Sequence, residues 1–361
     1  MRCVMRYFVV CAVWVMSCVG VEYYSFVDSD QHTPKILQSF GLGYEFLPEQ
    51  TDQRDAIESS AQYFLKRFDN SYTFIPIIRN MIAQEGLPQE FLFLAMVESE
   101  FIINAKSSKK ASGIWQFMPG TAKGLGLEIN DYIDERQDPI KSTQAAITYL
   151  KKLYDLTGEW YLAMMAYNCG YTRLQKAIEE AGGDSSLQTL LDEDKKYLPP
   201  ETRNYIRKIV AMSLVFNDAD FLKNNNSEYL LNRGATDTLA ILKLKSGVPL
   251  GIIAQSAGMS LKELRSYNMH FKYAFLPPGS SDKEYNVYLP YEKLARFKQH
   301  FDQNYTPNSA FILHKVQKGD TLSSIARQYK TNVNELKRVN GLKSTRLSIN
   351  QKIVIPIPKK S

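Results

Sequence analysis

The chain has 361 residues, of which 23% are charged, 44% hydrophobic and 12% aromatic. This length provides material for two or three domains, and the composition is ordinary for a soluble protein with a sizeable core. The net charge of +6 is concentrated at the end of the chain, where residues 311–361 carry eleven lysines and arginines against two acids. Such a tail can indicate nucleic-acid binding, but its hydrophobic pattern predicts a folded module, so we expect no nucleic-acid partner.

The cysteines argue against a disulfide framework and a metal site. Three of the four lie in the first 18 residues, and the set is Cys3, Cys11, Cys18 and Cys169. Their spacing is not that of metal ligands, so we expect no metal and no cofactor. Cys169 is expected to be a small buried residue and not a nucleophile, because no histidine is near it in sequence.

The beginning of the chain has the pattern of a secretory signal peptide. Arg2 and Arg6 precede an apolar run over residues 7–16. A run of about ten residues is too short to span a bilayer and is typical of the hydrophobic part of a signal peptide. We therefore predict a signal peptide over residues 1–18 and an exported, periplasmic protein.

The end of this signal resembles a loose bacterial lipobox. Ser17 and Cys18 follow the apolar run, with the unusual Met16 before them. The resemblance implies a lipid on Cys18, which would anchor the protein to a bacterial membrane. The alternative is ordinary cleavage near Gly20. The polar residues 19–50 are expected to form a tether.

Residues 51–225 have helical periodicity almost throughout and contain no β-run of any length. Helix starts are predicted near Pro88 and at Pro139, because proline is tolerated in a first turn. Gly170 is a helix-stop signal. The small, polar and lysine-rich residues 107–113 predict a loop. This region is therefore predicted to be an all-α domain.

One acid in this region occupies a position where an apolar residue is expected. A single face of a 3.6-residue period is formed by Phe91, Leu94, Ala95, Glu98, Phe101 and Ile102. Aiming a carboxyl group at a core is costly unless it is paired, hydrogen-bonded or protonated, and a protonated one can act as a general acid. Glu100 lies roughly 200° around the helix and is expected to be a solvated neighbour. On spacing alone, an ordinary salt-bridged acid is also consistent.

Three segments of the sequence favour a catalytic role for Glu98 over an ordinary salt bridge. Glu98-Ser99, residues 111–122 and residues 166–170 resemble, in order and spacing, the signature segments of family 1 lytic transglycosylases, which cut the glycan strands of peptidoglycan. The resemblance implies a lysozyme-like catalytic domain over residues 51–225 with Glu98 as the catalytic residue. Residues 134–139 are most similar to the membrane-bound lytic transglycosylase D group, which also carries C-terminal LysM units.

The same resemblance implies a set of substrate-binding residues, namely Ser107, Gln116, Met118, Tyr167, Asn168 and Tyr205. From the residues alone, Asn168 also fits a helix cap and Tyr205 a half-buried core position. Two departures concern neighbouring geometry: Ile102-Ile103 replaces a frequent Asn-Pro, and Cys169 replaces a usual alanine.

A repeat follows the polar break at residues 223–227. Ile253-Ala254, Glu263-Leu264 and Asn268 recur 72 positions later, as Ile325-Ala326, Glu335-Leu336 and Asn340. Internal repetition predicts two copies of one small unit, each with the order strand, helix, helix, strand. We place them at residues 235–292 and 311–358, with a linker at 293–310.

The second copy resembles the LysM module, which binds glycans that contain N-acetylglucosamine. The resemblance implies glycan contacts by Gly319, Asp320, Thr321, Leu347 and Ile349. Asn350 stands where the family's turn usually has glycine, and asparagine also tolerates positive φ. The first copy has residues 246–249 in place of a Gly-Asp-Thr turn, so we expect a degenerate LysM-like module there.

Cleavage of a glycosidic bond usually requires two carboxylates about 5–10 Å apart. No second one is obvious here, because Glu128, Asp131 and Asp134 lie in a predicted polar loop. The resemblance implies a mechanism with Glu98 alone. It would protonate the bond between N-acetylmuramic acid and N-acetylglucosamine and then act as a base while the C6 hydroxyl closes a 1,6-anhydro ring.

Two other interpretations stay open: a hydrolysing muramidase, and a non-catalytic protein that binds the peptidoglycan wall. The missing second carboxylate weighs against the first, and the intact Glu98 with its accompanying segments weighs against the second. The predicted fold class is α+β multidomain, with an all-α lysozyme-like domain followed by βααβ LysM-type modules. The predicted partner is the peptidoglycan glycan strand.

Overall fold

A computed structural model describes residues 32–43, 65, 73–227, 230, 238–280, 282–302, 309–340 and 342–358. The predicted signal peptide, including Cys18, and most of the predicted tether lie outside the described residues. The chain forms two compact units. Of the described residues, the first unit contains 32–43, 65, 156–227 and 230, and the second contains all the others.

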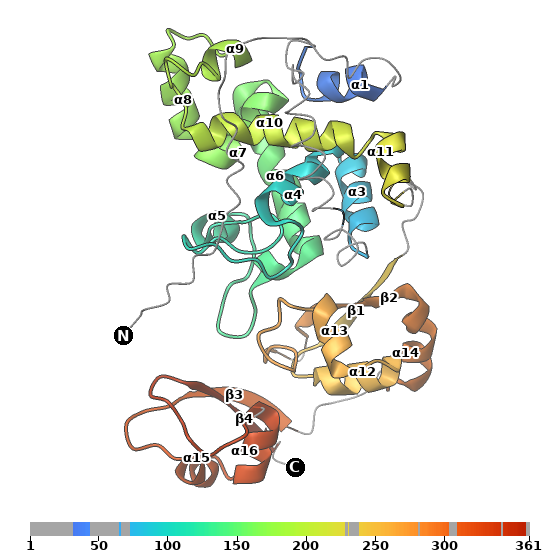
Figure 1. The fold of residues 1–361 in the computed structure, drawn as a ribbon. Coiled ribbons are helices and arrows are strands. Elements are labelled where there is room, and N and C mark those ends of the chain that lie inside the picture. Colours follow the sequence, from blue (N-terminus) through green and yellow to red (C-terminus); the bar gives the residue numbers. More distant parts are fainter. Residues whose placement is uncertain are drawn as a thin grey trace, which may run out of the picture. The chain divides into compact units, whose positions relative to one another are not determined.

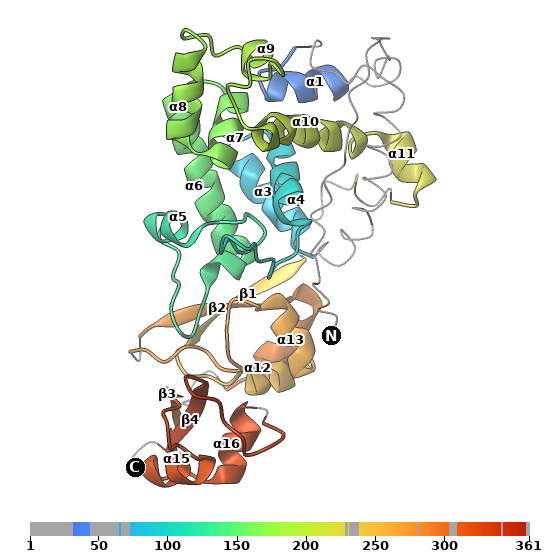
Figure 2. The same cartoon turned by 60° about the vertical axis from the view of Figure 1, so that its left-hand side comes forward.

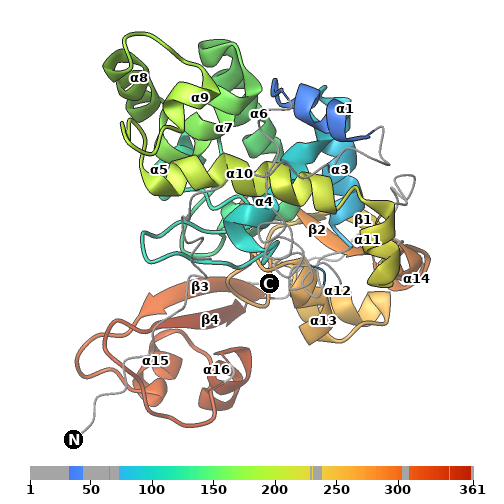
Figure 3. The ribbon, with the colours of Figure 1, turned by 45° about the horizontal axis from the view of Figure 1, so that its top comes forward.

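The first unit is helical (Figure 3). Its helices are α1 (His32–Ser39), α7 (Trp160–Cys169), α8 (Tyr171–Glu180), α9 (Leu187–Leu190), α10 (Pro200–Val215) and α11 (Ala219–Asn224). The central element is α10, which packs against both α1 and α7. Gly170 has φ +86° and ends α7, as its stop signal predicts.

Helix α1 corrects part of the predicted tether. Residues 32–39 are helical, and Ile36, Leu37 and Phe40 are buried. An apolar face packed on α10 is stabilised by removing its side chains from water. This part of residues 19–50 is therefore folded protein, which its polar flanks concealed.

The second unit begins with several short helices and one long helix. They are α3 (Ile75–Gln84), η2 (Gln89–Phe91), α4 (Leu92–Ser99), α5 (Pro119–Gly124), η3 (Glu135–Gln137) and α6 (Pro139–Thr157), whose last two residues belong to the first unit. The proline signals are confirmed, because Pro88 precedes η2 and Pro139 opens α6. Within residues 73–227 the structure contains only helices, turns and isolated bridges, which agrees with the all-α prediction.

Two βααβ modules complete the second unit (Figures 1 and 2). The first consists of β1 (Leu239–Lys245), α12 (Leu250–Ala257), α13 (Leu261–Tyr267) and β2 (Glu284–Pro290), followed by η5 (Tyr291–Lys293) and α14 (Leu294–His300). The second consists of β3 (Ser309–Lys315), α15 (Leu322–Gln328), α16 (Val333–Asn340) and β4 (Lys352–Pro358). In each module the two strands pair antiparallel. The predicted strand, helix, helix, strand order and the α+β class are confirmed.

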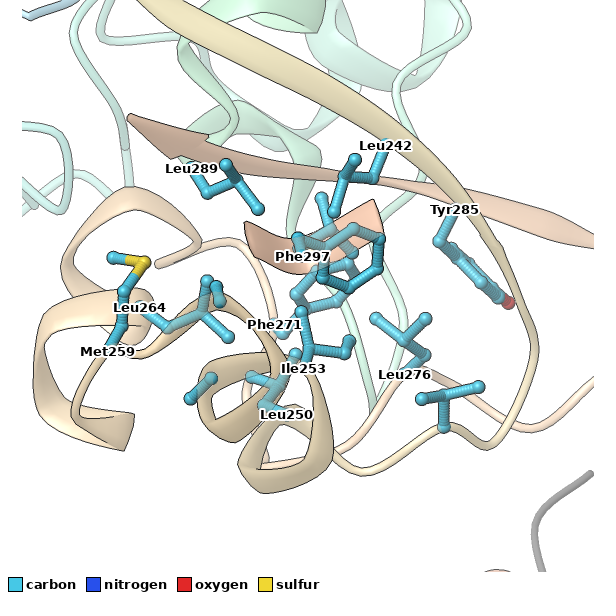
Figure 4. Close-up of a cluster of buried hydrophobic side chains, with 14 of the residues drawn as sticks. Leu242, Leu250, Ile253, Met259, Leu264, Phe271, Leu276, Tyr285, Leu289 and Phe297 are labelled. Atoms are coloured by element: carbon cyan, nitrogen blue, oxygen red, sulfur yellow. The ribbon is translucent and has the colours of Figure 1, made fainter. Parts of the chain in front are cut away.

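The core of the first module lies between its two-stranded sheet and its helices (Figure 4). Leu242 and Leu289 point from the strands toward Ile253 of α12. Phe297 of α14 is also buried in this cluster. The start of the predicted linker at 293–310 is therefore a helix of the module, because its aromatic side chain completes the core.

The recurring asparagine explains why the two copies share a fold. The Asn268 amide donates to the carbonyls of Leu264 and Tyr288 at 2.9 and 2.7 Å, and its oxygen accepts the Tyr288 N–H at 2.8 Å. Asn340 makes the same three bonds, to Leu336 and Val354, at 2.8, 2.8 and 2.7 Å. In each module the side chain ties the second helix to the returning strand, and buried amides require such partners.

Candidate active site

Glu98 lies in the last turn of α4. This short helix is buried on nearly all sides, including Leu92, Phe93 and Met96, and only Val97 and Glu98 within it are partly exposed. The predicted single apolar face is therefore wrong in detail. Glu98 is half-buried at the accessible side of an otherwise buried helix, and it is not aimed into the core.

The helix ends earlier than the periodicity predicted. Glu100 and Phe101 both have left-handed backbone conformations, with φ 54° and 55°. Such conformations are uncommon for residues other than glycine and stop a helix. Phe101 is nevertheless buried, whereas Ile102 is 36% exposed. The chain thus turns sharply two residues after Glu98.

Ser99 attaches the end of α4 to the signature segment. Its hydroxyl donates to the carbonyl oxygen of Ile114 at 2.8 Å, and it lies 3.1 Å from the carbonyl of Ala95. Both contacts are buried, so each contributes to a fixed geometry. The backbone beside Glu98 is consequently held against residues 111–118.

The signature segment folds into tight turns around Gly113. This residue has φ +85°, and a Cβ atom there would lie 1.7 Å from the carbonyl oxygen of Arg136. Gln116 also has a left-handed backbone, with φ 47°, and its side-chain amide donates to the Gly113 carbonyl at 2.7 Å. Gln116 thus has a clear partner, and its contact stabilises the turn that precedes Met118.

Arg136 fastens this segment from the other side. Its guanidinium pairs with the Asp134 carboxylate at 2.8 and 2.9 Å. The same side chain donates to the carbonyls of Lys110 and Phe117 at 2.7 and 3.0 Å. An arginine presents several donors in a fixed plane, and here it joins the two ends of the loop at 110–117.

The segment at 134–138 is not the solvated polar loop that we predicted for Asp134. All five residues are buried: Asp134, Glu135, Arg136, Gln137 and Asp138. Gln137 donates to the Ser112 hydroxyl at 3.1 Å, and Asp138 caps α6 by accepting the N–H groups of Ile140 and Lys141. Sequence reasoning missed this positioning role, although these residues were part of the family resemblance.

The remaining predicted site residues of the second unit differ in exposure. Ser107 is exposed and its hydroxyl accepts the N–H of Ala111 at 3.0 Å, which closes the loop. Met118 is 44% exposed, which is unusual for a large apolar side chain. The neighbouring Trp115 is fully buried and donates to the Thr143 hydroxyl at 2.9 Å, so it belongs to the core.

The other predicted substrate-binding residues belong to the first unit. Tyr167 and Asn168 are half-buried in the last turn of α7. The Thr202 hydroxyl donates to the Asn168 amide oxygen at 2.8 Å, so Asn168 joins α7 to α10. Tyr205 is 5% exposed on α10, which is the burial of a core residue.

Cys169 is half-buried, and less enclosed than we predicted. Burial raises the pKa of its thiol, and the nearby Arg173 only partly offsets this effect. The thiol therefore stays protonated at neutral pH, and a protonated thiol is a poor nucleophile. This agrees with the prediction that Cys169 does no covalent chemistry.

The predicted glycan-binding turn of the second module has a defined geometry. The Asp320 carboxylate accepts the N–H of Gln317 at 2.7 Å and contacts His314 at 2.8 Å, and these two contacts lower its pKa. Thr321 begins α15 with a capping box. Gly319 has φ +95°.

Two further residues of this module lie near its surface. Leu347 packs half-buried against the module core, whereas Ile349 is 62% exposed. Asn350 adopts φ 68°, as predicted for a residue in the glycine position of the turn.

The residues that the structure describes contain no group of three or more His, Cys, Asp or Glu side chains that could hold a metal ion. Among the same residues, no helix has the length and apolar character that crossing a membrane requires.

Comparison with protein families identifies three matching regions. Residues 76–188 match the transglycosylase SLT domain, residues 238–306 match the LysM-like domain of the lytic transglycosylase MltD, and residues 314–356 match the LysM domain. The resemblances to a lytic transglycosylase and to LysM are thus confirmed. The second match also includes α14, in agreement with its place in the core of the first module.

Individual proteins are also similar to parts of this chain. The chain is 31% identical over 294 residues to the membrane-bound lytic murein transglycosylase D of Escherichia coli, across 77% of this chain and 62% of that protein. It is 34% identical over 122 residues to a peptidoglycan transglycosylase of an Escherichia phage, across 33% of this chain and 9% of the relative. The 70 kDa soluble lytic transglycosylase of Escherichia coli aligns with a TM-score of 0.33 and 23% identity, over 43% of this chain and 25% of that one.

Proposed function

We propose that this chain, which carries a transglycosylase SLT domain and two LysM-type modules, is a peptidoglycan lytic transglycosylase. The observation that carries the proposal is the placement of Glu98. This half-buried acid lies in the last turn of a buried helix, and Ser99 joins the end of that helix to Ile114 in the signature segment at 111–122. A carboxyl group in such a partly desolvated and rigid position is suited to general acid catalysis.

Glu98 acts in both steps of the proposed reaction. It first protonates the oxygen of the β-1,4 bond between N-acetylmuramic acid and N-acetylglucosamine. As a carboxylate, it then takes the proton of the C6 hydroxyl while that oxygen attacks C1 of the same sugar. The products are a 1,6-anhydro-N-acetylmuramic acid end and a free N-acetylglucosamine end, and no water is consumed.

The state of the other acids supports a mechanism with one carboxyl group. The three earlier candidates are all engaged in ion pairs, Glu128 with Lys283, Asp131 with Lys352 and Asp134 with Arg136. The oxygens of these carboxylates are thus already engaged by cationic side chains. The proposal therefore assigns no second catalytic acid.

The proposed substrate-binding residues are those that the family resemblance implies. Gln116 and Met118 follow the Gly113 turn, and the exposed Met118 offers an apolar surface to a sugar ring. We assign Tyr167, Asn168 and Tyr205 to the same substrate, with Ser107 supporting the acid or the sugar. Tyr205 is buried within the first unit, and this burial favours support of neighbouring residues over direct contact with the glycan.

The products of purified peptidoglycan test this function. Mass analysis distinguishes an anhydro end from a reducing end, because the two differ by one water. Anhydro ends are expected. Reducing ends would instead support a hydrolysing muramidase, and intact glycan strands would support a non-catalytic wall-binding protein.

We further propose that the second module holds the enzyme on the wall through Gly319, Asp320, Thr321, Leu347 and Ile349. Replacing Ile349, which is 62% exposed, with alanine is expected to weaken retention on insoluble peptidoglycan about tenfold, because a buried isoleucine contributes about 1.5–3 kcal/mol. Ile241, which is 44% exposed on β1, is the matched control. A sedimentation assay measures how much of each alanine variant stays on insoluble peptidoglycan. If the Ile349 variant were retained as well as the Ile241 variant, the assignment of Ile349 to glycan binding would be contradicted.

The proposed location is the periplasm, with a lipid anchor on Cys18. Changing Cys18 to alanine is expected to move the protein from the membrane fraction to the soluble periplasmic fraction, because a multiply acylated cysteine anchors stably. Fractionation combined with fatty-acid labelling measures this. An unlabelled and already soluble wild-type protein would instead indicate ordinary cleavage near Gly20.

A further inference from the structure

The first LysM-like module has a buried residue on the outer face of its sheet. Along β2, Tyr285, Val287 and Leu289 point into the module core, as alternate residues of a strand do. Tyr288 lies on the opposite face, which in an isolated two-stranded sheet would meet water. It is nevertheless fully buried. Some other part of the second unit therefore covers this face.

The cover is the beginning of α6. The Tyr288 hydroxyl donates to the Asp138 carboxylate, with distances of 2.7 and 2.9 Å to its two oxygens. Asp138 is 1% exposed. Burial raises the pKa of Tyr288 well above its usual value, and the neighbouring carboxylate adds to this effect. The hydroxyl therefore keeps its proton and remains a donor to the buried Asp138 side chain, whose oxygens would be costly to leave without hydrogen bonds.

His270 completes this contact as an uncharged ring. It is 1% exposed, packs on Phe271 and Tyr288, and has its Nε2 atom 3.8 Å from Asp138. Burial lowers the pKa of His270, although the Asp138 carboxylate opposes this. The imidazole is thus neutral at pH 7 and acts by packing. The hydroxyl of Tyr288 is the polar group that carries the contact.

The backbone of the first module also forms hydrogen bonds with residues 132–134. The Asp134 N–H donates to the carbonyl of His270 at 2.9 Å, and the Lys272 N–H donates to the carbonyl of Tyr132 at 2.9 Å. Between them, Ile133 is buried in the core of the module. Residues 132–134 thus pair with residues 270–272 of the module through a short antiparallel bridge.

From there, buried contacts lead to the catalytic acid. Asp134 and Asp138 flank Arg136, which binds the two ends of the loop at 110–117. Within that loop, the carbonyl of Ile114 accepts the hydroxyl of Ser99, the residue after Glu98. Hydrogen bonds alternate with short stretches of backbone along this path, and most of its contacts are buried, so a displacement at Asp138 is transmitted through few contacts.

The second module lacks the hydrogen bond that Tyr288 makes to Asp138 in the first module. Val354 has the place of Tyr288, since the backbone N–H of each donates to the side-chain oxygen of the repeated asparagine. A valine cannot donate to a carboxylate, and Val354 instead packs with Phe275 and Phe311. The copy without the Gly-Asp-Thr turn is thus the one whose strand donates a hydrogen bond to the buried segment at 134–138.

We propose that residues 238–302 form a positioning module for the active site, with Tyr288 as the positioning residue that holds Asp138 and, through Arg136, the loop beside Glu98. The inference rests on the proposed lytic activity of this site. It assigns the degenerate module to the geometry of catalysis, whereas retention on the wall belongs to the second module.

The test compares Tyr288→Phe with Tyr285→Phe in the full chain. Both remove one hydroxyl from β2, but the Tyr285 hydroxyl contacts the partly exposed Lys283. On short soluble peptidoglycan fragments, Tyr288→Phe is expected to lower kcat roughly tenfold or more, because small displacements of a catalytic group are costly. KM and retention on insoluble peptidoglycan are expected to stay at the wild-type values. Tyr285→Phe is expected to behave as the wild type.

Hydrogen exchange of the same variants provides a readout that does not depend on activity. In Tyr288→Phe, the amides of residues 105–117 are expected to exchange faster, while those of α7 and α10 stay unchanged. Unchanged kcat or unchanged exchange in residues 105–117 would overturn the proposal, as would an equal effect of Tyr285→Phe. A wild-type protein that forms no anhydro ends would refute the proposed function instead, and the exchange pattern would still decide whether the module positions the loop.

Discussion

Replacing Glu98 with glutamine is expected to abolish cleavage of peptidoglycan while leaving the fold and wall binding intact. The amide preserves the shape of the side chain but cannot donate a proton to the leaving oxygen or accept one from the C6 hydroxyl. General acid–base catalysis typically contributes about 100- to 10,000-fold, so the rate of release of anhydro products should fall at least about 100-fold. Product analysis by mass, together with the melting temperature of the variant, measures both parts of this expectation.

Glu100 provides the matched control. It is two residues away, equally half-buried, and lies in the left-handed turn that ends α4. Glutamine has a similar tolerance for that backbone conformation, so Glu100→Gln should be nearly silent. An essential Glu100 with a dispensable Glu98 would reverse the assignment of the catalytic acid.

The second large effect is expected from Gly113→Ala. The new Cβ atom would lie 1.7 Å from the Arg136 carbonyl, and an alanine would also be strained at φ +85°. Backbone groups cannot move aside without disturbing the contacts of Arg136 to Lys110 and Phe117. We expect a loss of at least about 2 kcal/mol in the free energy of unfolding and a severe loss of lytic activity. Denaturant unfolding and product release measure the two effects.

Gly124→Ala separates this clash from a general effect of adding a methyl group. Gly124 ends α5, a few residues after the signature segment, and a Cβ atom there would meet nothing within 4 Å. Alanine is favoured over glycine in helices by up to about 1 kcal/mol, so this variant should be as stable as the wild type or slightly more. Equal destabilisation by both substitutions would rule out the close approach at Arg136 as the cause.

Local signals in the sequence accounted for most of the secondary structure. Pro139 and Gly170 mark helix ends because their backbone preferences act within a turn. The repeat at an offset of 72 predicted two βααβ modules, since one short pattern must build the same core twice. The asparagine that recurs in both copies has its reason in bonds made within each module.

Other features depended on contacts that a local pattern does not contain. The face that included Phe101 assumed that α4 continues, whereas the chain turns at Glu100 and Phe101 through conformations that non-glycine residues rarely adopt. The burial of Phe101 accompanies this turn. The sequence predicts a tether and a linker where helices α1 and α14 lie, because only a few of their side chains are apolar. These apolar side chains are buried by helices and strands that are distant in the sequence.

The sequence by itself determined the chemical groups: an acid beside a signature segment, the resemblance of that segment to lytic transglycosylases, and a repeat whose second copy resembles LysM. These features depend on residue identity and short spacing, which can be recognised without knowledge of the fold. The tertiary structure alone decided that residues 134–138 are buried and that Tyr288 donates to Asp138 across 150 positions of sequence. Charged residues in a row predict a solvated loop unless distant partners satisfy them, and such partners become visible only when the chain has folded.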